Sequence, residues 1–455
     1  MRFNYIMTML GLALLVTFGC SKSESDSGNS DNTNTDPVDQ GVSEFADNNP
    51  LNDVMMQSFW WDSFSDNRIG SNSFYGFLES KVVELSNAHF DLIWLPPPSE
   101  GEGMGYHPRK LFDFNSNFGT ENELSSLLTL LGNRQMHGMA DLVINHRVGT
   151  DTWTDFTNPS WSCESICIDD EGYTDPNAFG TTPCGDLDEG EQWGGARDLN
   201  HKSGEVQNGI KEYLSRLKAV GFDSWRYDFV KGFPAKYVGE YNSSTSYYFS
   251  VGEYWDGNAT AIQSWIDASA NTVGGSSTNA SPAFDFDLKY KLKTAIIDKS
   301  YGVLRSNTDS QVGLAGISGY GSKSVTFLDN HDTGCINRSD CNNLYSTSTG
   351  NIRIGYVYLL THPGVPMVWG YHYFFQDSSG NLKKDINELI TLRKELNINA
   401  NSVVEVLDTV DGANGYYAAK VDNKLIVKIG YGSYSPGGNW VEEKSGSGYQ
   451  IWVSN

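Results

Sequence analysis

The sequence is poor in positive charge. It has 32 Lys and Arg residues against 56 Asp and Glu residues, which gives a formal net charge of −24 at pH 7. A field of this sign repels nucleic acid and anionic polymers, so it argues against a role in binding them. A neutral substrate is compatible with it, although acidity also serves solubility alone.

The N-terminus lacks an apolar run long enough to cross a membrane. Arg2 precedes an apolar stretch at residues 7–18, and Gly19 and Cys20 follow it. A stretch of this length is typical of an export signal, and its end resembles a bacterial lipoprotein signal, although Thr17 stands where Leu is more usual. We expect export and lipid anchoring to the outer membrane on Cys20, facing the periplasm or the cell surface. The alternative is an ordinary cleaved signal with a chance cysteine.

Apolar residues are almost absent from residues 21–40, which are mainly Ser, Asp, Asn and Glu. Such a segment cannot bury enough surface to fold. We therefore expect a signal peptide at 1–20 and a disordered tether at 21–48.

Cysteines are few, and no CxxC pair or nearby His cluster supports the alternative of a zinc site. An exported chain favours disulfides. Cys335 and Cys341 lie in one loop and are expected to pair. The remaining three leave the pairing open, with one cysteine left over: Cys163, Cys167 and Cys184.

Short apolar runs alternate with helical patterns from about residue 52 onward. Helical spacing of apolar residues is found at 121–131, 206–220 and 385–396. Alternation of this kind predicts a parallel sheet, and eight units predict a closed (β/α)₈ barrel. The eight predicted strands are residues 54–59, 92–96, 139–144, 222–228, 248–253, 283–286, 325–329 and 365–369.

Two regions break the alternation. Residues 148–200 are rich in Asp, Gly, Pro and Cys, and we expect an excursion domain there, after the third strand. Short strands with turns from about residue 400 predict a small antiparallel sheet. The barrel is thus placed at 49–147 and 201–397, and the C-terminal domain at 398–455.

Polar side chains gather where several predicted strands end. Asp228, Glu253 and Asp332 follow the fourth, fifth and seventh strands, and His146 follows the third. The carboxyl ends of barrel strands carry the reactive groups in this fold. Each acid alone could be a helix cap or a salt-bridge partner, but their joint occurrence at separate strand ends favours a site.

Carboxylates brought together favour different protonation states, which is what glycoside hydrolysis requires of a nucleophile and an acid. Arg226 lies two residues before Asp228, so both emerge on one face of the strand, and the guanidinium would keep Asp228 ionised. Apolar and aromatic neighbours would keep Glu253 protonated.

Four segments resemble the signature regions of the α-amylase superfamily (glycoside hydrolase family 13). They are residues 141–146, 221–232, 251–255 and 327–332. Residues 105–113 add to the likeness, and residues 361–366 and 425–430 are similar to the plant-type branch. The resemblance runs in order from Asp53 to the end of the chain, and four ordered motifs are far more specific than one.

The resemblance implies a role for each matching residue. Asp228 would be the nucleophile, Glu253 the general acid and then base, and Asp332 the group that stabilises the transition state. His146 and His331 would bind sugar hydroxyls, and Arg226 would orient Asp228. Tyr106 would stack under the sugar ring, while Lys231 and Trp255 would shape the leaving-group side.

The resemblance also implies bound Ca²⁺. Asn145, Asp188 and Asp198 would bind it through side chains, and Glu191 and Gly232 through backbone carbonyls. Hard oxygen ligands from two segments suit this ion. The alternative is a merely solvated acidic loop around Asp188. Gly232 stands where many family members carry His.

The expected function is therefore retaining endo-hydrolysis of α-1,4-glucan by a monomer, with starch-type or glycogen-type polysaccharide as the partner. One alternative is glucan transfer by the same site, with a sugar hydroxyl in place of water. Another is a binding protein without catalysis, which the complete set of carboxylates disfavours.

Overall fold

The computed structural model describes residues 41–174, 180–270, 279–334 and 348–455. The signal peptide, residues 21–40 of the tether and the predicted pair Cys335–Cys341 lie outside these ranges, so those expectations remain predictions. None of the helices within the described ranges is long and apolar enough to cross a membrane.

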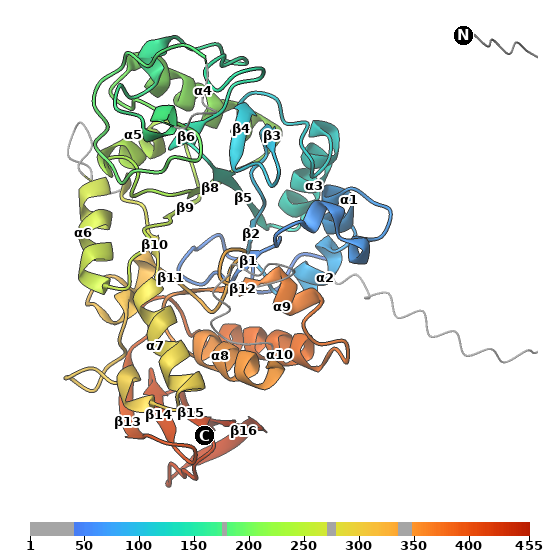
Figure 1. The fold of residues 1–455 in the computed structure, drawn as a ribbon. Helices are drawn as coiled ribbons and strands as arrows, with labels where there is room; N and C mark the ends of the chain where they lie inside the picture. Colours follow the sequence, from blue (N-terminus) through green and yellow to red (C-terminus); the bar gives the residue numbers. More distant parts are fainter. Residues whose placement is uncertain (1–40, 175–179, 271–278, 335–347) are drawn as a thin grey trace, which may run out of the picture. The chain divides into compact units, whose positions relative to one another are not determined.

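Eight parallel strands close into a barrel, which confirms the predicted fold (Figure 1). Around the barrel the order is β1-β12-β11-β10-β9-β8-β5-β2, and β1 closes the ring by pairing with both β2 and β12. The strand interiors are buried on both faces, as the nearly continuous apolar runs predicted. The strands are β1 Met55–Gln57, β2 Leu92–Trp94, β5 His137–Leu142, β8 Ser224–Tyr227, β9 Phe249–Gly252, β10 Ala283–Phe284, β11 Ser324–Phe327 and β12 Val365–Trp369.

Helices surround the barrel. Thr120 and Glu123 form a capping box at the start of α3, and Gly221 ends α4 with a φ of 126°, which disfavours other residues. The described helices are α1 Phe74–Glu79, α2 Val82–Asn87, α3 Glu121–Asn133, α4 Gly204–Val220, α5 Lys236–Ser244, α6 Ala259–Ser269, α7 Phe286–Ile297, α8 Thr349–Thr361, α9 Gly370–Phe374 and α10 Asn381–Glu395. Short 3₁₀ turns occupy Ser63–Ser65, Asn67–Ile69, Cys163–Ser165, Glu171–Thr174, Tyr301–Leu304, Leu314–Gly316 and Gly321–Lys323.

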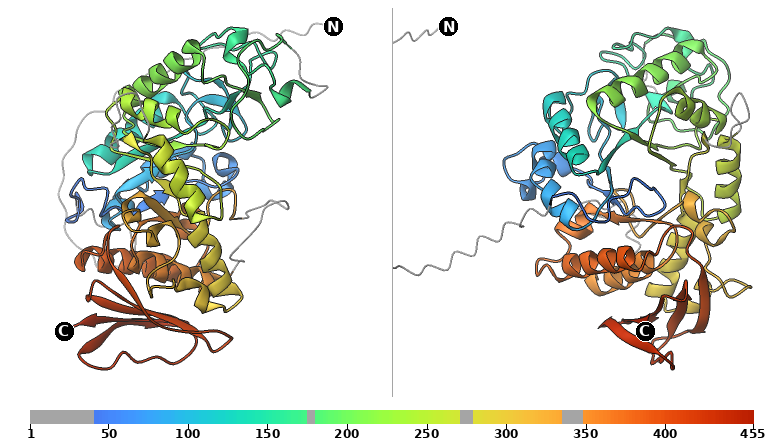
Figure 2. Two further views of the ribbon diagram at one scale, coloured as in Figure 1. Left: turned by 90° about the vertical axis from the view of Figure 1, so that its left-hand side faces the viewer. Right: turned by 180° about the vertical axis from the view of Figure 1, so that it is seen from behind.

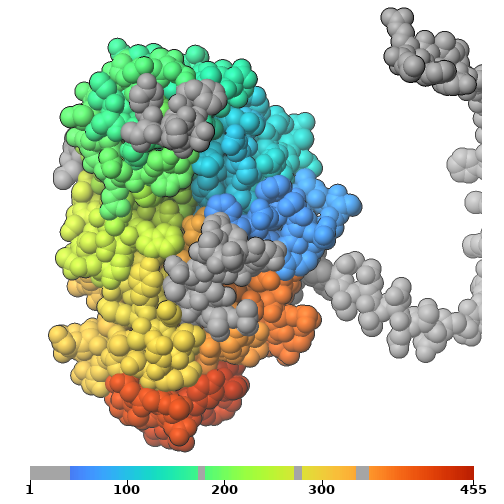
Figure 3. Space-filling view, in the orientation of Figure 1, coloured from blue at the N-terminus to red at the C-terminus, as the bar shows by residue number. Residues whose placement is uncertain are grey.

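The excursion after β5 is held by few regular elements. Its strands β6 (His146–Arg147) and β7 (Arg197–Asp198) pair antiparallel, and the hairpin β3 (Glu100–Glu102) with β4 (His107–Lys110) lies beside it. Figure 3 shows these two parts of the chain side by side, in green and cyan. A disulfide joins Cys163 to Cys184, and Cys167 is a buried free thiol.

The C-terminal residues form the predicted antiparallel sheet, in the order β13-β14-β15-β17-β16. It packs on the helices after β11 and β12: Tyr417 Oη lies 3.0 Å from His362 Nε2 beyond α8, and Lys444 Nζ lies 2.9 Å from Asp385 Oδ1 of α10 (Figure 2). The strands are β13 Val404–Val410, β14 Tyr416–Val421, β15 Leu425–Gly430, β16 Trp440–Gly446 and β17 Tyr449–Ser454.

Residues 41–48, which the sequence analysis assigns to the tether, contact the barrel. The carbonyl of Gly41 accepts hydrogen bonds from Ser86 Oγ and Arg134 Nη1. The ring of Phe45 meets His89 edge-on at 4.8 Å. The part of the tether that the structure describes is therefore attached to the folded domain, because its few apolar and hydrogen-bonding groups find partners there.

Candidate active site

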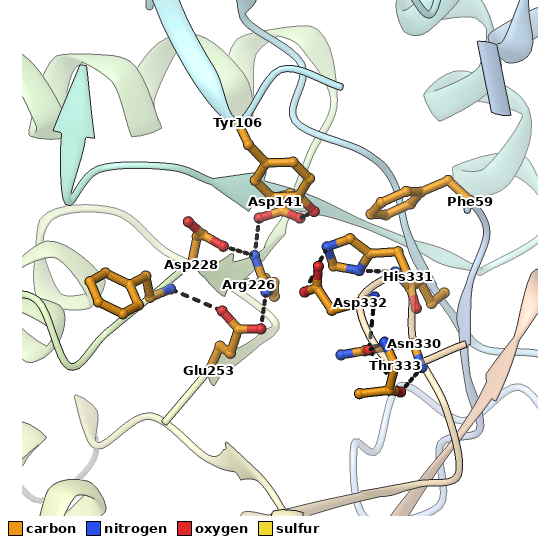
Figure 4. A network of polar contacts seen from close by, with 12 residues as sticks. Phe59, Tyr106, Asp141, Arg226, Asp228, Glu253, Asn330, His331, Asp332 and Thr333 are labelled. Carbon is orange, nitrogen blue, oxygen red and sulfur yellow. Dashed lines mark hydrogen bonds and ion pairs between the residues drawn. The ribbon is translucent and has the colours of Figure 1, made fainter. Parts of the chain in front are cut away.

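Three acids that follow different strands lie together at the carboxyl ends of the barrel strands. Asp228 continues β8, its amide donating to Leu142 O at 3.0 Å, and Glu253 continues β9, its amide donating to Tyr227 O at 2.9 Å. Asp332 comes from the loop after β11. Figure 4 shows the side chains of all three directed toward the same region.

Arg226 is the centre of the polar network. This guanidinium is fully buried, and its Nη1 lies 2.6 Å from Asp228 Oδ1 while its Nη2 lies 2.8 Å from Glu253 Oε1 (Figure 4). Nη1 also lies 2.7 Å from Asp141 Oδ1, and the Trp94 ring packs against the guanidinium at 4.9 Å. One rigid cation thus fixes Asp228 and Glu253 at a short separation from each other.

Burial and neighbouring charges shift the pKa values of several groups at this cation. Burial raises the pKa of Glu253 well above its usual value, and Asp228 and Asp332 raise it further, while Arg226 opposes the shift. Burial also raises the pKa of Asp141 to about 7. Burial disfavours the charge of Arg226, but Asp141, Glu253 and Asp228 raise its pKa well above the usual value. Glu253 is therefore suited to donate a proton at neutral pH.

Asp332 is held by the turn that contains it. Asn330 Oδ1 accepts hydrogen bonds from the amides of Asp332 and Thr333, at 3.1 and 3.0 Å. His331 Nε2 lies 3.2 Å from Asp332 Oδ2, and the Asp332 side chain remains 30% exposed. The carboxylate therefore has a fixed backbone but remains partly accessible to solvent.

Tyr106 links the two histidines that the sequence analysis places at the site. Its ring stacks on His331 at 5.2 Å with an interplanar angle of 5°, and its hydroxyl donates to Asp141 Oδ2 at 2.7 Å. The carbonyl of Tyr106 lies 2.8 Å from His146 Nε2. Burial lowers the pKa of His146 to about 4, so His146 is neutral at pH 7.

Comparison with known proteins identifies the family. The model of the alpha-amylase C-terminal beta-sheet domain matches residues 395–453. A probable alpha-amylase 2 of Arabidopsis thaliana is 32% identical over 418 residues, which cover 88% of this chain and 94% of the relative. The chain belongs to the α-amylase family.

Two further proteins are similar to this chain. A glucan 1,4-alpha-maltotetraohydrolase of Roseateles saccharophilus is 26% identical over 432 residues, covering 88% of this chain and 72% of the relative. Among solved structures, an Anoxybacillus alpha-amylase matches with a TM-score of 0.62 at 17% identity, covering 90% of this chain and 99% of that one. The last likeness concerns the fold.

In this α-amylase-type glycoside hydrolase, Lys231 and Trp255 lie on the loops that follow the barrel strands β8 and β9. Lys231 Nζ lies 3.1 Å from Asp256 Oδ2 and 3.3 Å from Glu191 Oε1, so it joins the excursion to the β9 loop. Trp255 is 39% exposed. One ring face packs on Phe286, and the indole N–H donates to Tyr290 Oη at 2.8 Å. Its orientation is therefore fixed while part of its ring stays accessible.

The residues predicted to bind a cation come together in part. Asn145 Nδ2 lies 3.2 Å from Asp198 Oδ1, and a Cβ added to Gly232 would lie 2.0 Å from Asn145 Oδ1, so only glycine fits there. Glu191 lies next to this point, because its amide donates to Lys231 O at 2.9 Å. The close approach of Asn145 is a physical reason for glycine at this position.

An acidic cluster, defined as Asp170, Glu171 and Asp198, adds two residues that sequence reasoning missed. Carboxylate oxygens of all three lie within 4.8 Å of one another. Burial raises the pKa of Asp198 to about 9, with Glu171, Asp170 and the predicted ligand Asp188 contributing. Asp188 is thus an electrostatic neighbour of the cluster, and its amide donates to Asp169 Oδ1 at 2.8 Å. Crowded hard oxygens of this kind can hold a divalent cation.

Sequence reasoning also missed Asp141 and Gln57 as parts of the reactive centre. Asp141 lies inside β5 and bonds to Arg226 and Tyr106, and Gln57 ends β1 beside His331. The sequence carried a signal for both, since each is a polar residue within a predicted apolar strand. The hydrophobic pattern of the sequence does not show which side chains these two residues contact.

Proposed function

We propose that this enzyme hydrolyses internal α-1,4-glucosidic bonds of starch-type or glycogen-type α-glucans and retains the anomeric configuration. The observation that carries the proposal is the binding of Asp228 and Glu253 to two nitrogens of one buried guanidinium. Retaining glycosidases need two carboxyl groups about 5–5.5 Å apart, whereas inverting enzymes need about 6.5–9.5 Å. Two carboxyls on one planar cation support the shorter spacing.

In this mechanism Asp228 attacks the anomeric carbon while Glu253 protonates the leaving oxygen. Glu253 then takes a proton from the water that releases the sugar. The raised pKa of Glu253 and the contact of Asp228 with Arg226 support these roles. Asp332, with its accessible carboxylate beside His331, is placed to bind sugar hydroxyls and to stabilise the positive charge that develops on the ring.

Tyr106, His146 and His331 would line the sugar that is attacked. Tyr106 offers a half-buried aromatic ring. His146 is neutral and lies near enough to Asp228 for that acid to raise the His146 pKa against the larger effect of burial. Lys231 and Trp255 would contact the departing chain at the rim. The exposed part of the Trp255 ring supports this, because sugar rings pack on aromatic faces.

We also propose a bound Ca²⁺ next to the excursion. Asn145, Asp188 and Asp198, with the carbonyls of Glu191 and Gly232, would hold the ion, and Asp170 and Glu171 would supply further oxygens. Burial and the neighbouring charges of Glu171 and Asp170 raise the pKa of Asp198, which supports a cation there because the ion would balance the negative charge. When bound, calcium supplies structural charge balance and links the excursion to the barrel.

Product analysis on amylose tests the proposed function. We expect a rapid fall in the chain length of amylose. NMR of the first turnovers should show new reducing ends in the α configuration. Release of β-anomers would contradict retention. Elongated products in place of hydrolysis would identify glucan transfer. Binding of amylose without any product formation would identify a binding protein.

Export and anchoring are a separate proposal. We infer from the residues up to Cys20 that the mature protein is lipid-anchored to the outer membrane. Mass spectrometry of the protein extracted from membranes should find a diacylglyceryl group on the cysteine. Release of a Cys20→Ser variant into the soluble fraction would support the anchor, and an unmodified cysteine in the membrane-bound protein would reject it.

A further inference from the structure

Gln57 is a buried polar residue that the mechanism above does not use. It ends β1 inside the barrel and has no exposed surface. Its Nε2 lies 2.7 Å from His331 Nδ1, although the two residues are 274 positions apart in sequence. This contact links the first barrel strand to the loop that carries Asp332.

His331 has both ring nitrogens engaged and its orientation fixed. Nδ1 faces Gln57, and Nε2 lies 3.2 Å from Asp332 Oδ2. The ring is 2% exposed and is enclosed by aromatic rings with centroids at 5.1–5.7 Å. The enclosing residues are Phe59, Trp61, Trp94 and Tyr106.

The partners determine which nitrogen carries the proton. A carboxylate oxygen accepts, so the contact with Asp332 favours a neutral ring with its proton on Nε2, although the other tautomer stays accessible to a ring that has no partner on Nδ1. Nδ1 then has a lone pair and accepts a hydrogen bond from the Gln57 amide. Two further charged groups of the described structure are linked to this ring through Tyr106: Asp141, which accepts from the Tyr106 hydroxyl, and Arg226, which binds Asp141.

Gln57 destabilises the fold through one buried atom, which argues against a purely structural role. Its Oε1 is buried, and none of the described residues donates a hydrogen bond to it. A buried carbonyl without a partner is destabilising, whereas an apolar side chain of similar volume would fill the same space without this cost. The favourable contact of the amide in the described structure is the one to His331.

We propose that Gln57 is a positioning residue that holds His331 in the tautomer with its proton on Nε2. This N–H then points toward Asp332 and the sugar hydroxyl that the two groups share. Without Gln57, the ring can place its proton on Nδ1 and lose the donor that faces the substrate. The identity of the substrate in this proposal rests on the proposed function. The assignment of the His331 tautomer is independent of that function.

The test compares two Gln57 variants with a control on the same strand. Gln57→Met removes the donor at similar volume, and Gln57→Glu replaces it with an acceptor. Met55→Leu changes the core of β1 without touching His331 and controls for general disturbance of the strand. Long-range ¹H–¹⁵N spectra of the full chain labelled with ¹⁵N-histidine report the tautomer of each ring, and the spectrum of His331→Gln assigns the signal.

We expect the native protein to show His331 protonated on Nε2 alone. Gln57→Met should give a mixture of tautomers, and Gln57→Glu should protonate both nitrogens because its carboxylate accepts from Nδ1. The kcat of Gln57→Met should fall about tenfold, the effect of one neutral hydrogen bond, with KM little changed. Its Tm should equal or exceed that of the native protein, and Met55→Leu should keep native turnover.

Two results would overturn the proposal. One is a native His331 with its proton on Nδ1, which would mean that Gln57 presents its oxygen. The other is a Gln57→Met variant with native tautomer and native kcat. If the native protein does not hydrolyse α-glucan, the proposed function fails, but the NMR result still decides the role of Gln57.

Discussion

The reactive centre and the acidic cluster both crowd carboxylates together, but they balance the charge in different ways. At the reactive centre Arg226 contacts Asp141, Asp228 and Glu253. In the excursion Arg197 Nε lies 2.7 Å from Asp170 Oδ2, and Asp198 keeps a pKa raised to about 9. At the first site one fixed cation contacts all three acids, so these acids can serve chemistry. At the second site the pKa of Asp198 stays raised despite the presence of Arg197, so the site is suited to an added ion, which would give its acids a structural role.

The largest expected effect is on turnover at the reactive centre. Glu253→Gln should lower kcat by about 10²- to 10⁴-fold, because it removes the proton donor while preserving shape. Initial-rate kinetics on amylose measure this, and circular dichroism should show a native fold. The control is Glu212→Gln on the exposed side of α4, which should keep native turnover. Near-native activity of Glu253→Gln would reject the assignment of the acid.

Removal of the fixed cation comes next. Arg226→Met should lower the free energy of unfolding by about 3–5 kcal/mol, since it leaves buried carboxylates without their partner. The matched variant is Arg197→Met, measured by urea unfolding with and without calcium. If the comparison holds, calcium restores much of the stability of Arg197→Met and little of that of Arg226→Met. Equal responses to calcium would show that the two sites do not differ in this way.

Removal of calcium should have a smaller effect. Excess chelator should lower the Tm of the native protein by about 5 °C, because an ion that binds only the folded state stabilises it by about 3 kcal/mol at a hundredfold excess over its Kd. Differential scanning calorimetry measures the shift. Asp198→Asn should abolish most of the response to chelator. An unchanged Tm of the native protein in excess chelator would count against the cation site.

The smallest expected effect is on pH dependence. Glu253 must be protonated to act as the acid, so activity should fall as the pH rises through its raised pKa. The raised pKa also means that this group stabilises the fold below its unfolded pKa, and the contribution is lost as the pH rises. Asp332→Asn removes one negative neighbour of Glu253 and should move the alkaline limb of the residual kcat/KM profile to lower pH. An unchanged or higher limb would contradict the coupling.

The sequence was sufficient for the architecture because the barrel strands are apolar along almost their whole length. The runs at residues 92–96 and 365–369 became β2 and β12, and helical spacing at 121–131 became α3. The bounds differ by a few residues, since polar residues such as Asp228 and Glu253 continue beyond the paired part of a strand. Of the three excursion cysteines, Cys163 and Cys184 pair, which local pattern could not decide.

The candidate site was predictable only where its residues follow strand ends in recognisable motifs. Arg226 lies two residues before Asp228, so their contact followed from strand geometry. The contacts of Gln57 with His331 and of Glu171 with Asp198 join segments far apart or without periodicity. Such contacts depend on how the loops close over the barrel, and side-chain pattern carries no information about that.

The attachment of residues 41–48 has a consequence for access to the enzyme. Gly41 binds Ser86 and Arg134, which lie on the segments that lead into β2 and β5, at the amino ends of the strands. Asp228 and Glu253 lie at the carboxyl ends. The chain therefore leaves the barrel on the side opposite its mouth. An enzyme held from that side would present an open entrance to large polymers arriving from the medium.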